Sequence, residues 1–446
     1  MPTPAARVRR PLTLLTVAIA LGAWPGVACA QPAALTAAAR AEVIEALAGN
    51  LTRLYVDADT ARLIAARLQA RLRAGAYDTA AAPARFAELV TSDLRAVNND
   101  LHLGLQYRGP VAEPGAGPRP AGGDPFGTQA RSRNFGLERV EILPGNVGYL
   151  EITGFIGAPG FEEALGDAMR FLSRTDALIV DVRRNGGGSG QMSHLAFSHF
   201  LGATPVPTIR VVERGTGRDE VRRSDAQVPG PRRTDVPLYV LTSQGTASAA
   251  EEFSFVLKNQ GRATIVGDRT AGAGHMVRGL PVGHGFVGSV SITRVSDPKS
   301  GLEWERVGVQ PDVRVAPERA LDAAHAAALR TIAQRATDER RALLARTAET
   351  VEARLKDVRP DAASLARWTG VYDGGRRVEL VDGRLLYRPR AAVMGEALVP
   401  LGDDRFAAGT TRFAFAMDGA TPRLTIERAN GSRLAYPRTA SLAAAP

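Results

Sequence analysis

Hydrophobic and polar positions change their spacing several times along the chain, and each change predicts a different kind of structure. Between residues 35 and 97 the apolar side chains recur at helical spacing in three stripes, the second ending at Gly75 and the third following Pro83. Residues 98–105 then form a polar turn that leads into an alternating strand. We therefore expect an N-terminal helical domain over residues 31–105.

Short apolar runs alternate with helical stretches between residues 134 and 318. The runs predict strands at residues 147–152, 177–182, 238–241, 263–266 and 286–295. Helices are expected between several of them, at residues 162–172, 192–201 and 249–259. This alternation predicts an α/β core in which most strands pair in parallel.

Three further segments complete the predicted organisation. Residues 106–133 are rich in Pro and Gly and form a linker or mobile loop. Residues 319–360 are rich in Ala, Arg and Glu and predict a helical connector that packs on the core. From residue 361 to residue 446 the period changes to two, with Asp-Gly and Asn-Gly turns, which predicts a small C-terminal antiparallel β domain.

The first 30 residues have the features of a signal peptide. A positive start with three arginines precedes an apolar stretch too short to span a bilayer and the cleavage site Ala28-Cys29-Ala30. Cleavage would leave a mature chain that begins near Gln31 and is exported, either periplasmic or secreted. An alternative is a lipoprotein acylated on Cys29, which Gly26 disfavours because that position normally carries Leu or Val.

Length and composition narrow the possible functions. A chain of 446 residues with 45% hydrophobic content has enough material for two or three domains. Removing the three leader arginines from the 56 basic residues leaves 53 against 46 acidic residues, a formal net charge of +7. The arginines are scattered, so nucleic-acid binding is not expected. We also expect no stable membrane anchor after signal cleavage.

Metal and cofactor sites are not expected either. The only cysteine, Cys29, leaves with the signal peptide, so the mature chain has no thiolate ligand. The six histidines show no H-E-x-x-H spacing. The glycine-rich loop at residues 181–190 lacks both the Lys-Ser/Thr ending of a P-loop and the spacing of a dinucleotide-binding turn.

Ser248 stands where the strand at 238–241 gives way to the helix at 249–259. One interpretation is structural: Ser248 and Glu251 form a capping box. The other is chemical: at a helix N-terminus the hydroxyl of Ser248 lies among unpaired N–H groups, so it could act as a nucleophile with an oxyanion held by the N–H of Ala249. This stretch alone does not decide between them.

Other candidate residues also carry two interpretations when each is taken alone. The glycines of loop 181–190 either make a plain turn or allow N–H groups to approach a ligand closely. His102 is either a packed histidine or a titratable group near neutral pH. Glu305 is either a solvated charge or a partner for a catalytic base.

Five motifs in order resemble those of the C-terminal (tail-specific) processing proteases. They are GNVGYLEITGF, ALIVDVRRNGGGSG, LTSQGTASAAEEF, IVGDRTAGAGH and WERVGVQPD. The resemblance is closest to the branch related to interphotoreceptor retinoid-binding protein and to the tricorn core, and it covers about residues 134–315. It implies a layered α/β core of the crotonase/ClpP-like kind.

The resemblance assigns roles to individual residues. The family's nucleophile falls on Ser248 and its oxyanion donors on Ala249 and Gly187. The D-x-R-x-N-x-G-G loop that supports this site falls on four residues: Asp181, Arg183, Asn185 and Gly188.

The general base departs from the usual pattern of these proteases. Most of them use a lysine in the second glycine-rich turn, but Ala273 stands at that position. Tricorn-like members use Ser, His and Glu, and their His and Glu fall on His102 and Glu305. His275 is the alternative base, since it lies close to the same turn.

The sequence therefore predicts an exported serine peptidase with a Ser-His-Glu mechanism and no serine-lysine dyad. Its partners would be peptides or unfolded proteins, and the C-terminal β domain could support oligomer assembly. The alternative is a non-catalytic binding protein that carries apolar ligands on a lapsed protease fold. The missing lysine motivates this alternative, and the presence of Ser248, His102 and Glu305 weighs against it.

Overall fold

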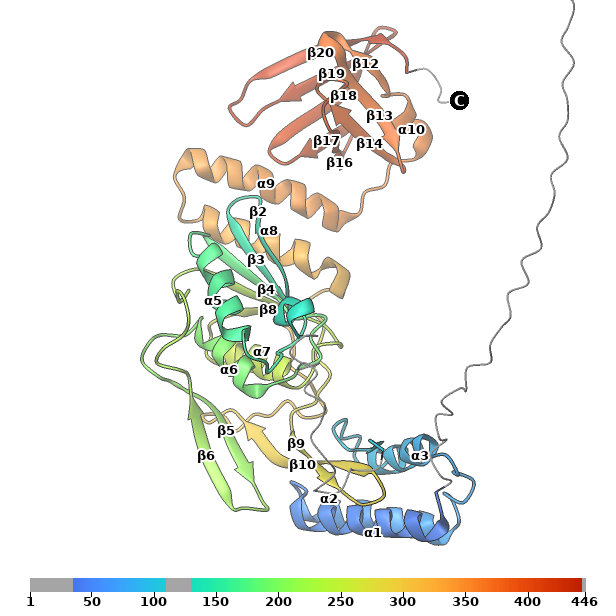
Figure 1. Cartoon of the computed structure of the whole chain (residues 1–446). Coiled ribbons are helices and arrows are strands. Elements are labelled where there is room, and N and C mark those ends of the chain that lie inside the picture. The colour runs from blue at the N-terminus through green and yellow to red at the C-terminus, as the bar shows by residue number, and fades with distance from the viewer. Residues whose placement is uncertain (1–34, 110–129, 443–446) are drawn as a thin grey trace, which may run out of the picture.

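The computed structural model describes residues 35–109 and 130–442. The expected signal peptide and most of the expected linker lie outside the described residues. Helices α1 to α3 occupy one end of the molecule, the α/β core its middle and a β domain the other end (Figure 1). Helices α8 and α9 lie between the core and the β domain.

Three N-terminal helices form where the apolar stripes predict them. They are α1 (Ala37–Leu54), α2 (Ala58–Arg73) and α3 (Pro83–Arg95). Side-chain oxygens of Thr36 and Asp57 accept from first-turn N–H groups of α1 and α2, which satisfies donors that the helix itself leaves unpaired. Pro83 opens α3, where its missing N–H costs nothing.

These helices do not bury their apolar faces among themselves alone. Their core cluster also contains Val282, Phe286, Val290 and Ile292, which come from the far side of the sequence. The expected helical domain at 31–105 therefore shares one core with part of the segment predicted as the α/β core.

The central sheet has six strands in the order β11-β8-β7-β4-β3-β2. They are β2 (Leu137–Leu143), β3 (Val147–Ile152), β4 (Ala177–Asp181), β7 (Leu238–Thr242), β8 (Thr264–Gly267) and β11 (Val313–Arg314). All neighbours pair in parallel except β2 and β3. The predicted α/β core with largely parallel pairing is confirmed.

Alternate residues of these strands belong to two separate cores. Leu178, Val180 and Val240 pack with helices α5 (Phe161–Phe171), α6 (Gly190–Ser198) and α7 (Ala249–Asn259). Ile179 and Leu241 pack with α8 (Ala320–Ala333) on the other face. Both faces are covered, which explains why the strands read as continuous apolar runs.

A second, antiparallel sheet links the core to the N-terminal helices. Its order is β1-β10-β5-β6, with β9 also paired to β10. The strands are β1 (Gly104–Tyr107), β5 (Pro207–Glu213), β6 (Arg218–Arg223), β9 (Met276–Pro281) and β10 (Phe286–Ser296). The strand expected at 286–295 therefore exists but lies outside the central sheet. The β5–β6 hairpin was not predicted, because most of β6 is exposed and charged and has no apolar alternation.

The C-terminal part follows its predicted classes. The expected connector is two helices, α8 and α9 (Asp338–Lys356), followed by the short α10 (Ala362–Ala366). Nine antiparallel strands then form one sheet around a separate apolar cluster. They are β12 (Gly370–Tyr372), β13 (Arg376–Val381), β14 (Arg384–Arg388), β15 (Glu396–Ala397), β16 (Val399–Gly402), β17 (Arg405–Ala408), β18 (Thr411–Asp418), β19 (Thr421–Glu427) and β20 (Arg433–Ala440).

Across the described ranges, no helix combines the length and the apolar character needed to cross a membrane.

Candidate active site

Ser248 lies between β7 and α7 in a backbone conformation that side chains rarely adopt. Its φ is 53° and its ψ is −120°, and its N–H donates to Glu251 Oε2 at 2.8 Å. Residues held in such sparsely populated φ/ψ regions cost about 1–3 kcal/mol each and cluster at functional sites. The carboxylate half of the predicted capping box is thus present, and it holds a strained serine at the helix entrance.

Glu251 ties the serine to the second glycine-rich turn. The same oxygen that binds the Ser248 N–H also accepts from the N–H of Ala273 at 2.8 Å, and the other oxygen accepts from Gly272 at 2.7 Å and from the hydroxyl of Thr270. Burial raises the pKa of Glu251. The resemblance places Ala273 where the family has its lysine. The backbone N–H groups of Ala273 and Ser248 bind the same oxygen of Glu251, so the two residues lie close together.

The first glycine-rich loop lies directly against Ser248. A Cβ added to Gly187 would lie 2.8 Å from the Cβ of Ser248 and 3.2 Å from the N of Ala249. Gly187 has a φ of 106°, so both its conformation and its surroundings require glycine. The loop that the resemblance assigns to the site therefore lies against the serine, while its role as an oxyanion donor stays a prediction.

Hydrogen bonds within this loop bear on its expected role as an oxyanion donor. The N–H of Gly187 donates to Asn185 Oδ1 at 2.9 Å, so this amide is engaged. Asn185 is fully buried, and its carbonyl accepts from Ala247 at 3.1 Å. In the described part of the chain the N–H groups of Gly188 and Ala249 have no hydrogen-bond partner.

Asp181 and Arg183 bind each other and support the start of the loop through residues other than Ser248. Asp181 is buried at the end of β4 and accepts from the Tyr149 hydroxyl at 2.8 Å and from Arg183 Nε at 3.0 Å. The guanidinium of Arg183 also donates to the carbonyl of Pro317. These contacts fix the start of the loop against the sheet and against the 3-10 turn Pro317–Arg319 that precedes α8.

Two carboxylates and two imidazoles alternate in a buried row beside this site. Glu305 Oε2 lies 3.7 Å from His275 Nδ1, which lies 3.3 Å from Asp100 Oδ2. Asp100 Oδ1 in turn lies 4.0 Å from His102 Nδ1. Glu305 is held in place by the N–H groups of Gly274 and His275, at 2.7 and 3.0 Å.

This row differs from the expected pairing of Glu305 with His102. The structure places Asp100 beside the His102 imidazole, and Glu305 contacts His275. Asp100 was missed from the sequence, although its position two residues before His102 could have indicated it. Tyr55 was missed too: its hydroxyl donates to Asp100 Oδ2 at 3.0 Å and accepts from Asn98 at 2.7 Å.

Burial and charge set the protonation of the row. Burial opposes the charge of Asp100, but the hydrogen bond and the charge of His275 outweigh it and lower the pKa of Asp100 to about 2. Burial lowers the pKa of His102 and outweighs Asp100, which raises it. Burial also raises the pKa of Glu305, which His275 only partly offsets. A neutral His102 beside an ionised Asp100 has the protonation state that a general base needs at neutral pH.

The serine and the row are not joined by a direct hydrogen bond. Within residues 35–109 and 130–442, neither His102 nor His275 has a hydrogen bond to the Ser248 hydroxyl. Such bonds are often long in ligand-free enzymes and shorten when substrate binds.

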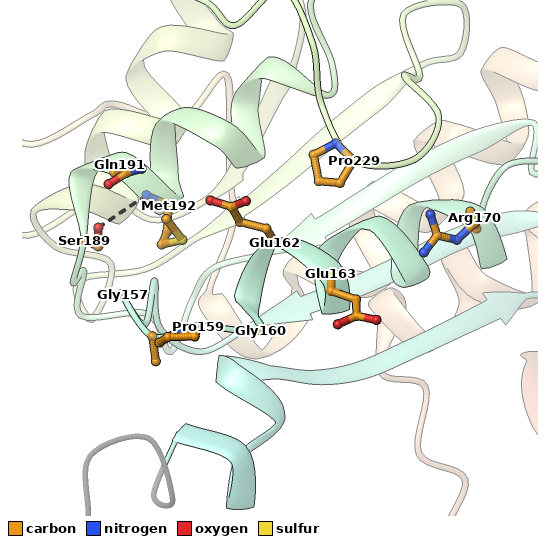
Figure 2. Close-up of a pocket in the computed structure, with 11 residues that line it drawn as sticks. Gly157, Pro159, Gly160, Glu162, Glu163, Arg170, Ser189, Gln191, Met192 and Pro229 are labelled. Atoms are coloured by element: carbon orange, nitrogen blue, oxygen red, sulfur yellow. Dashed lines mark hydrogen bonds between the residues drawn. The ribbon is translucent and has the colours of Figure 1, made fainter. Parts of the chain in front are cut away.

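Two adjoining cavities open next to the Gly187 loop. One of about 420 Å³ is lined by Phe155, Ile156 and Gly187 among others. It shares Gly157 and Ser189 with a second cavity of about 690 Å³. Figure 2 shows the larger cavity between α5, with Glu162, Glu163 and Arg170, and the start of α6, with Ser189 and Met192. Ser248 lines neither cavity, but the smaller one reaches Gly187, which lies against the serine.

Residues 146–315 match the profile of peptidase family S41. A chloroplastic C-terminal processing peptidase from Tetradesmus obliquus is 33% identical over 151 residues, which are 32% of this chain and 29% of that protein. The carboxy-terminal processing protease CtpB from Bacillus subtilis is 28% identical over 172 residues, 38% of this chain and 34% of that protein. The aligned part spans about a third of the length of each relative.

Two solved structures align with this chain at low identity. A lipoprotein from Streptococcus agalactiae aligns with a TM-score of 0.46 and 15% identity, covering 65% of this chain and 96% of its own. The photosystem II D1 C-terminal processing protease aligns with a TM-score of 0.40 and 18% identity, covering 63% and 93%. The family match and the processing proteases among the relatives confirm the resemblance predicted from the five motifs, whereas its retinoid-binding branch stays a prediction.

Proposed function

We propose that this chain, whose residues 146–315 match the profile of peptidase family S41, is an exported serine peptidase that cleaves peptides or unfolded proteins. The observation that carries the proposal is the strained Ser248 at the N-terminus of α7, pressed between the Gly187 loop and the turn that holds Ala273. A simple helix cap requires neither the strain nor the crowding.

Acylation would use Ser248 as the nucleophile and His102 as the base. The Ser248 Oγ bonds to the carbon of the scissile carbonyl while its proton passes to His102. The C–N bond then breaks, and the imidazolium returns the proton to the leaving amine. Water hydrolyses the resulting ester with His102 again acting as base.

The charge that develops in this step has suitable partners on both sides. The N–H of Ala249 and one N–H of the glycine loop would hold the oxyanion. In the loop, the N–H of Gly187 already donates to Asn185, whereas the N–H of Gly188 has no partner among the described residues. Asp100 would stabilise the imidazolium of His102. Glu305 would act through His275 by fixing the other side of Asp100.

Export is part of the proposal and rests on the first 30 residues of the sequence. Expression of the full chain in a bacterial host tests it, by N-terminal sequencing of the protein recovered from the periplasm. A sequence that begins near Gln31 supports export, and a chain that keeps Met1 in the cytosol contradicts it.

The peptidase activity is tested with the mature chain and unstructured peptides. We expect Ser248→Ala to lower kcat/KM to the level of the uncatalysed reaction, with the protein still folded by circular dichroism. His102→Ala and His275→Ala identify the base, since loss of the base lowers kcat. His284→Ala is a matched control, because His284 is an exposed residue paired with Glu42 on α1. Equal rates for the wild type and Ser248→Ala would rule out the proposal.

A non-catalytic carrier of apolar ligands is the second candidate. It is favoured by one observation, that the Ser248 hydroxyl has no hydrogen bond to an imidazole in the described residues. Saturable binding of a fatty acid or retinoid, together with no peptide cleavage by the wild type, would support the carrier over the peptidase.

A further inference from the structure

Asp100, His275 and Glu305 meet in one buried cluster although they come from three distant parts of the sequence. One ligand atom from each lies within 4.8 Å of the others. All three side chains are at least nine-tenths buried. The cluster forms no sequence motif, because Asp100 and His275 are 175 residues apart along the chain and His275 and Glu305 are 30 apart.

The distances within the cluster fit a small divalent cation. Zinc bonds of about 2.0–2.1 Å to nitrogen and oxygen in a tetrahedral site place neighbouring ligand atoms about 3.3–3.4 Å apart. The observed separations are 3.3 Å from His275 Nδ1 to Asp100 Oδ2 and 3.7 Å from His275 Nδ1 to Glu305 Oε2. The ligand oxygens of Asp100 and Glu305 lie within 4.8 Å of each other, so the two carboxylates would turn toward the ion to complete three bonds.

Unpartnered atoms provide a second and independent observation. Glu305 Oε1 is buried without any hydrogen-bond partner, and so is His102 Nδ1 beside the same Asp100. Buried polar atoms are normally paired, because an unpaired one costs about 1–3 kcal/mol. Glu305 Oε2 keeps the N–H groups of Gly274 and His275, so Oε1 is the lone oxygen that a cation could still engage.

The cluster also has access from solvent. A cavity of about 210 Å³ is lined by His275 and Glu305 and by further charged residues: Asp57, Arg294, Glu303 and Arg306. Its polar lining can hold the water of a hydrated ion, whereas an apolar cavity of the same size would stay dry.

We propose that Asp100, His275 and Glu305 form a binding site for Zn²⁺, and that an ion bound there inhibits the peptidase. The zinc site stands on its own geometry, and the inhibition rests on the proposed function. A divalent charge beside Asp100 would cancel the negative charge that stabilises the His102 imidazolium. The ion would also occupy the nitrogen through which His275 contacts Asp100.

Direct binding is tested with the tag-free mature chain and Zn²⁺, by competition with a chromogenic zinc chelator. We expect one ion per chain. Glu305→Gln and His275→Gln should each weaken binding at least 10-fold. Glu305→Gln keeps an oxygen that can accept from Gly274 and His275, so it preserves the fold even if His275→Gln does not. His194→Ala is the matched control and should bind as the wild type does, since His194 has a single carboxylate partner, Asp225, at 3.4 Å.

Two results would overturn the zinc site: no stoichiometric binding by the wild type, or unchanged binding by Glu305→Gln. Inhibition is judged separately, in peptide cleavage with chelator and with one equivalent of Zn²⁺. Loss of cleavage with zinc and its recovery with chelator support it. Zinc binding without any change in cleavage overturns it. A wild type that cleaves nothing even with chelator overturns the proposed function, while the binding titration still decides the zinc site.

Discussion

Asp100 joins three parts of the chain through one carboxylate. It accepts from Tyr55 of the N-terminal helices and from His275 of the second glycine turn, and it lies beside His102. Its low pKa keeps it ionised across the range in which imidazoles titrate. The charge of this one residue therefore controls how easily a neighbouring histidine accepts a proton.

Asp100→Asn should change the pH dependence of cleavage in a defined direction. Burial lowers the pKa of His102, and ionised Asp100 partly offsets this by raising it. A neutral asparagine removes that offset, so the pKa of His102 should fall further. In the wild type, the acid limb of the pH profile of kcat/KM should lie below the ordinary imidazole pKa of about 6.5. In Asp100→Asn this limb should move to still lower pH. The plateau should fall by roughly 10²-fold or more, because the imidazolium loses its counter-charge.

Peptide cleavage measured between about pH 4 and pH 9 checks this expectation. Asp225→Asn is the control, since Asp225 lies beside His194, away from the row. An acid limb that moves to higher pH in Asp100→Asn would contradict the proposed arrangement.

Glu252 is a second residue whose charge the fold opposes. It is buried on α7, its Oε1 has no partner, and burial raises its pKa from 4.5 to about 7. A carboxyl with a raised pKa folds most favourably when protonated, so its contribution is full below about pH 4.5 and is lost as the pH rises through about 7. Glu252→Gln should therefore stabilise the core by about 1–3 kcal/mol at pH 8 and by little at pH 4.5.

Urea unfolding of Glu252→Gln and the wild type at both pH values measures this difference. Glu45→Gln, an exposed change on α1, should have no such dependence. Equal stability differences at the two pH values would mean that Glu252 is not the charged group that destabilises the folded state.

The glycine loop and helix α7 act as one unit at the scale of elements. The loop leaves β4, α7 follows β7, and these neighbouring parallel strands end at the same edge of the sheet. Asn185 joins the two elements by accepting from the Ala247 N–H. The approach of Gly187 to Ser248 thus follows from strand order.

Gly187→Ala should destroy the site without unfolding the protein. The new methyl group would meet the Cβ of Ser248 and the carbonyl of Ala247, each at 2.8 Å, and alanine at a φ of 106° is strained by about 1–3 kcal/mol. We expect kcat/KM to fall at least about 10²-fold, because the serine and the oxyanion donors are displaced.

Gly186→Ala is the matched control for this change. A Cβ at Gly186 meets nothing within 4 Å, so cleavage and stability should stay close to those of the wild type. A Gly187→Ala protein as active as Gly186→Ala would show that the loop does not take part in catalysis.

Four apolar clusters hold together residues 35–109 and 130–442, and the candidate site draws on two of them. Ser248 belongs to a helix packed in the cluster around the central sheet, whereas Leu103, next to His102, is buried in the cluster of the N-terminal helices. Strand β10 connects the two, since it pairs with β1 and carries Phe286 into the helical cluster.

Phe286→Ala and Phe413→Ala distinguish these clusters. Phe286 is buried against the rings of Phe86 and Tyr107, with distances between ring centroids of 5.5 and 5.1 Å. Phe413 is buried in the C-terminal sheet. Each change should cost its own domain about 3–5 kcal/mol. Only Phe286→Ala should also lower kcat/KM at temperatures where both proteins remain folded, because it loosens the support of His102. Calorimetry and peptide cleavage measure the two effects, and an equal loss of activity in both variants would contradict this division.

Local pattern allowed much of the architecture to be predicted. Helix α7 begins and ends at the residues that its apolar period and Gly261 indicate, and β3, β4, β7 and β8 lie within a residue or two of their apolar runs. Strands β2, β9 and β11 were not predicted. The β5–β6 hairpin escaped prediction because exposed charged strands lack such runs. The sheet to which β10 belongs was not predicted either, because an alternating apolar pattern does not identify the strand with which it pairs.

The sequence by itself determined the classes of element, the helix N-terminus that carries Ser248 and the absence of a lysine at Ala273, since each of these depends on residues close together in the chain. The tertiary structure decided the partners: Asp100 beside His102, Glu305 against His275, and all of them within one buried row. The physical reason is that the charge interactions of this row act across a few ångströms of space between residues up to 175 positions apart.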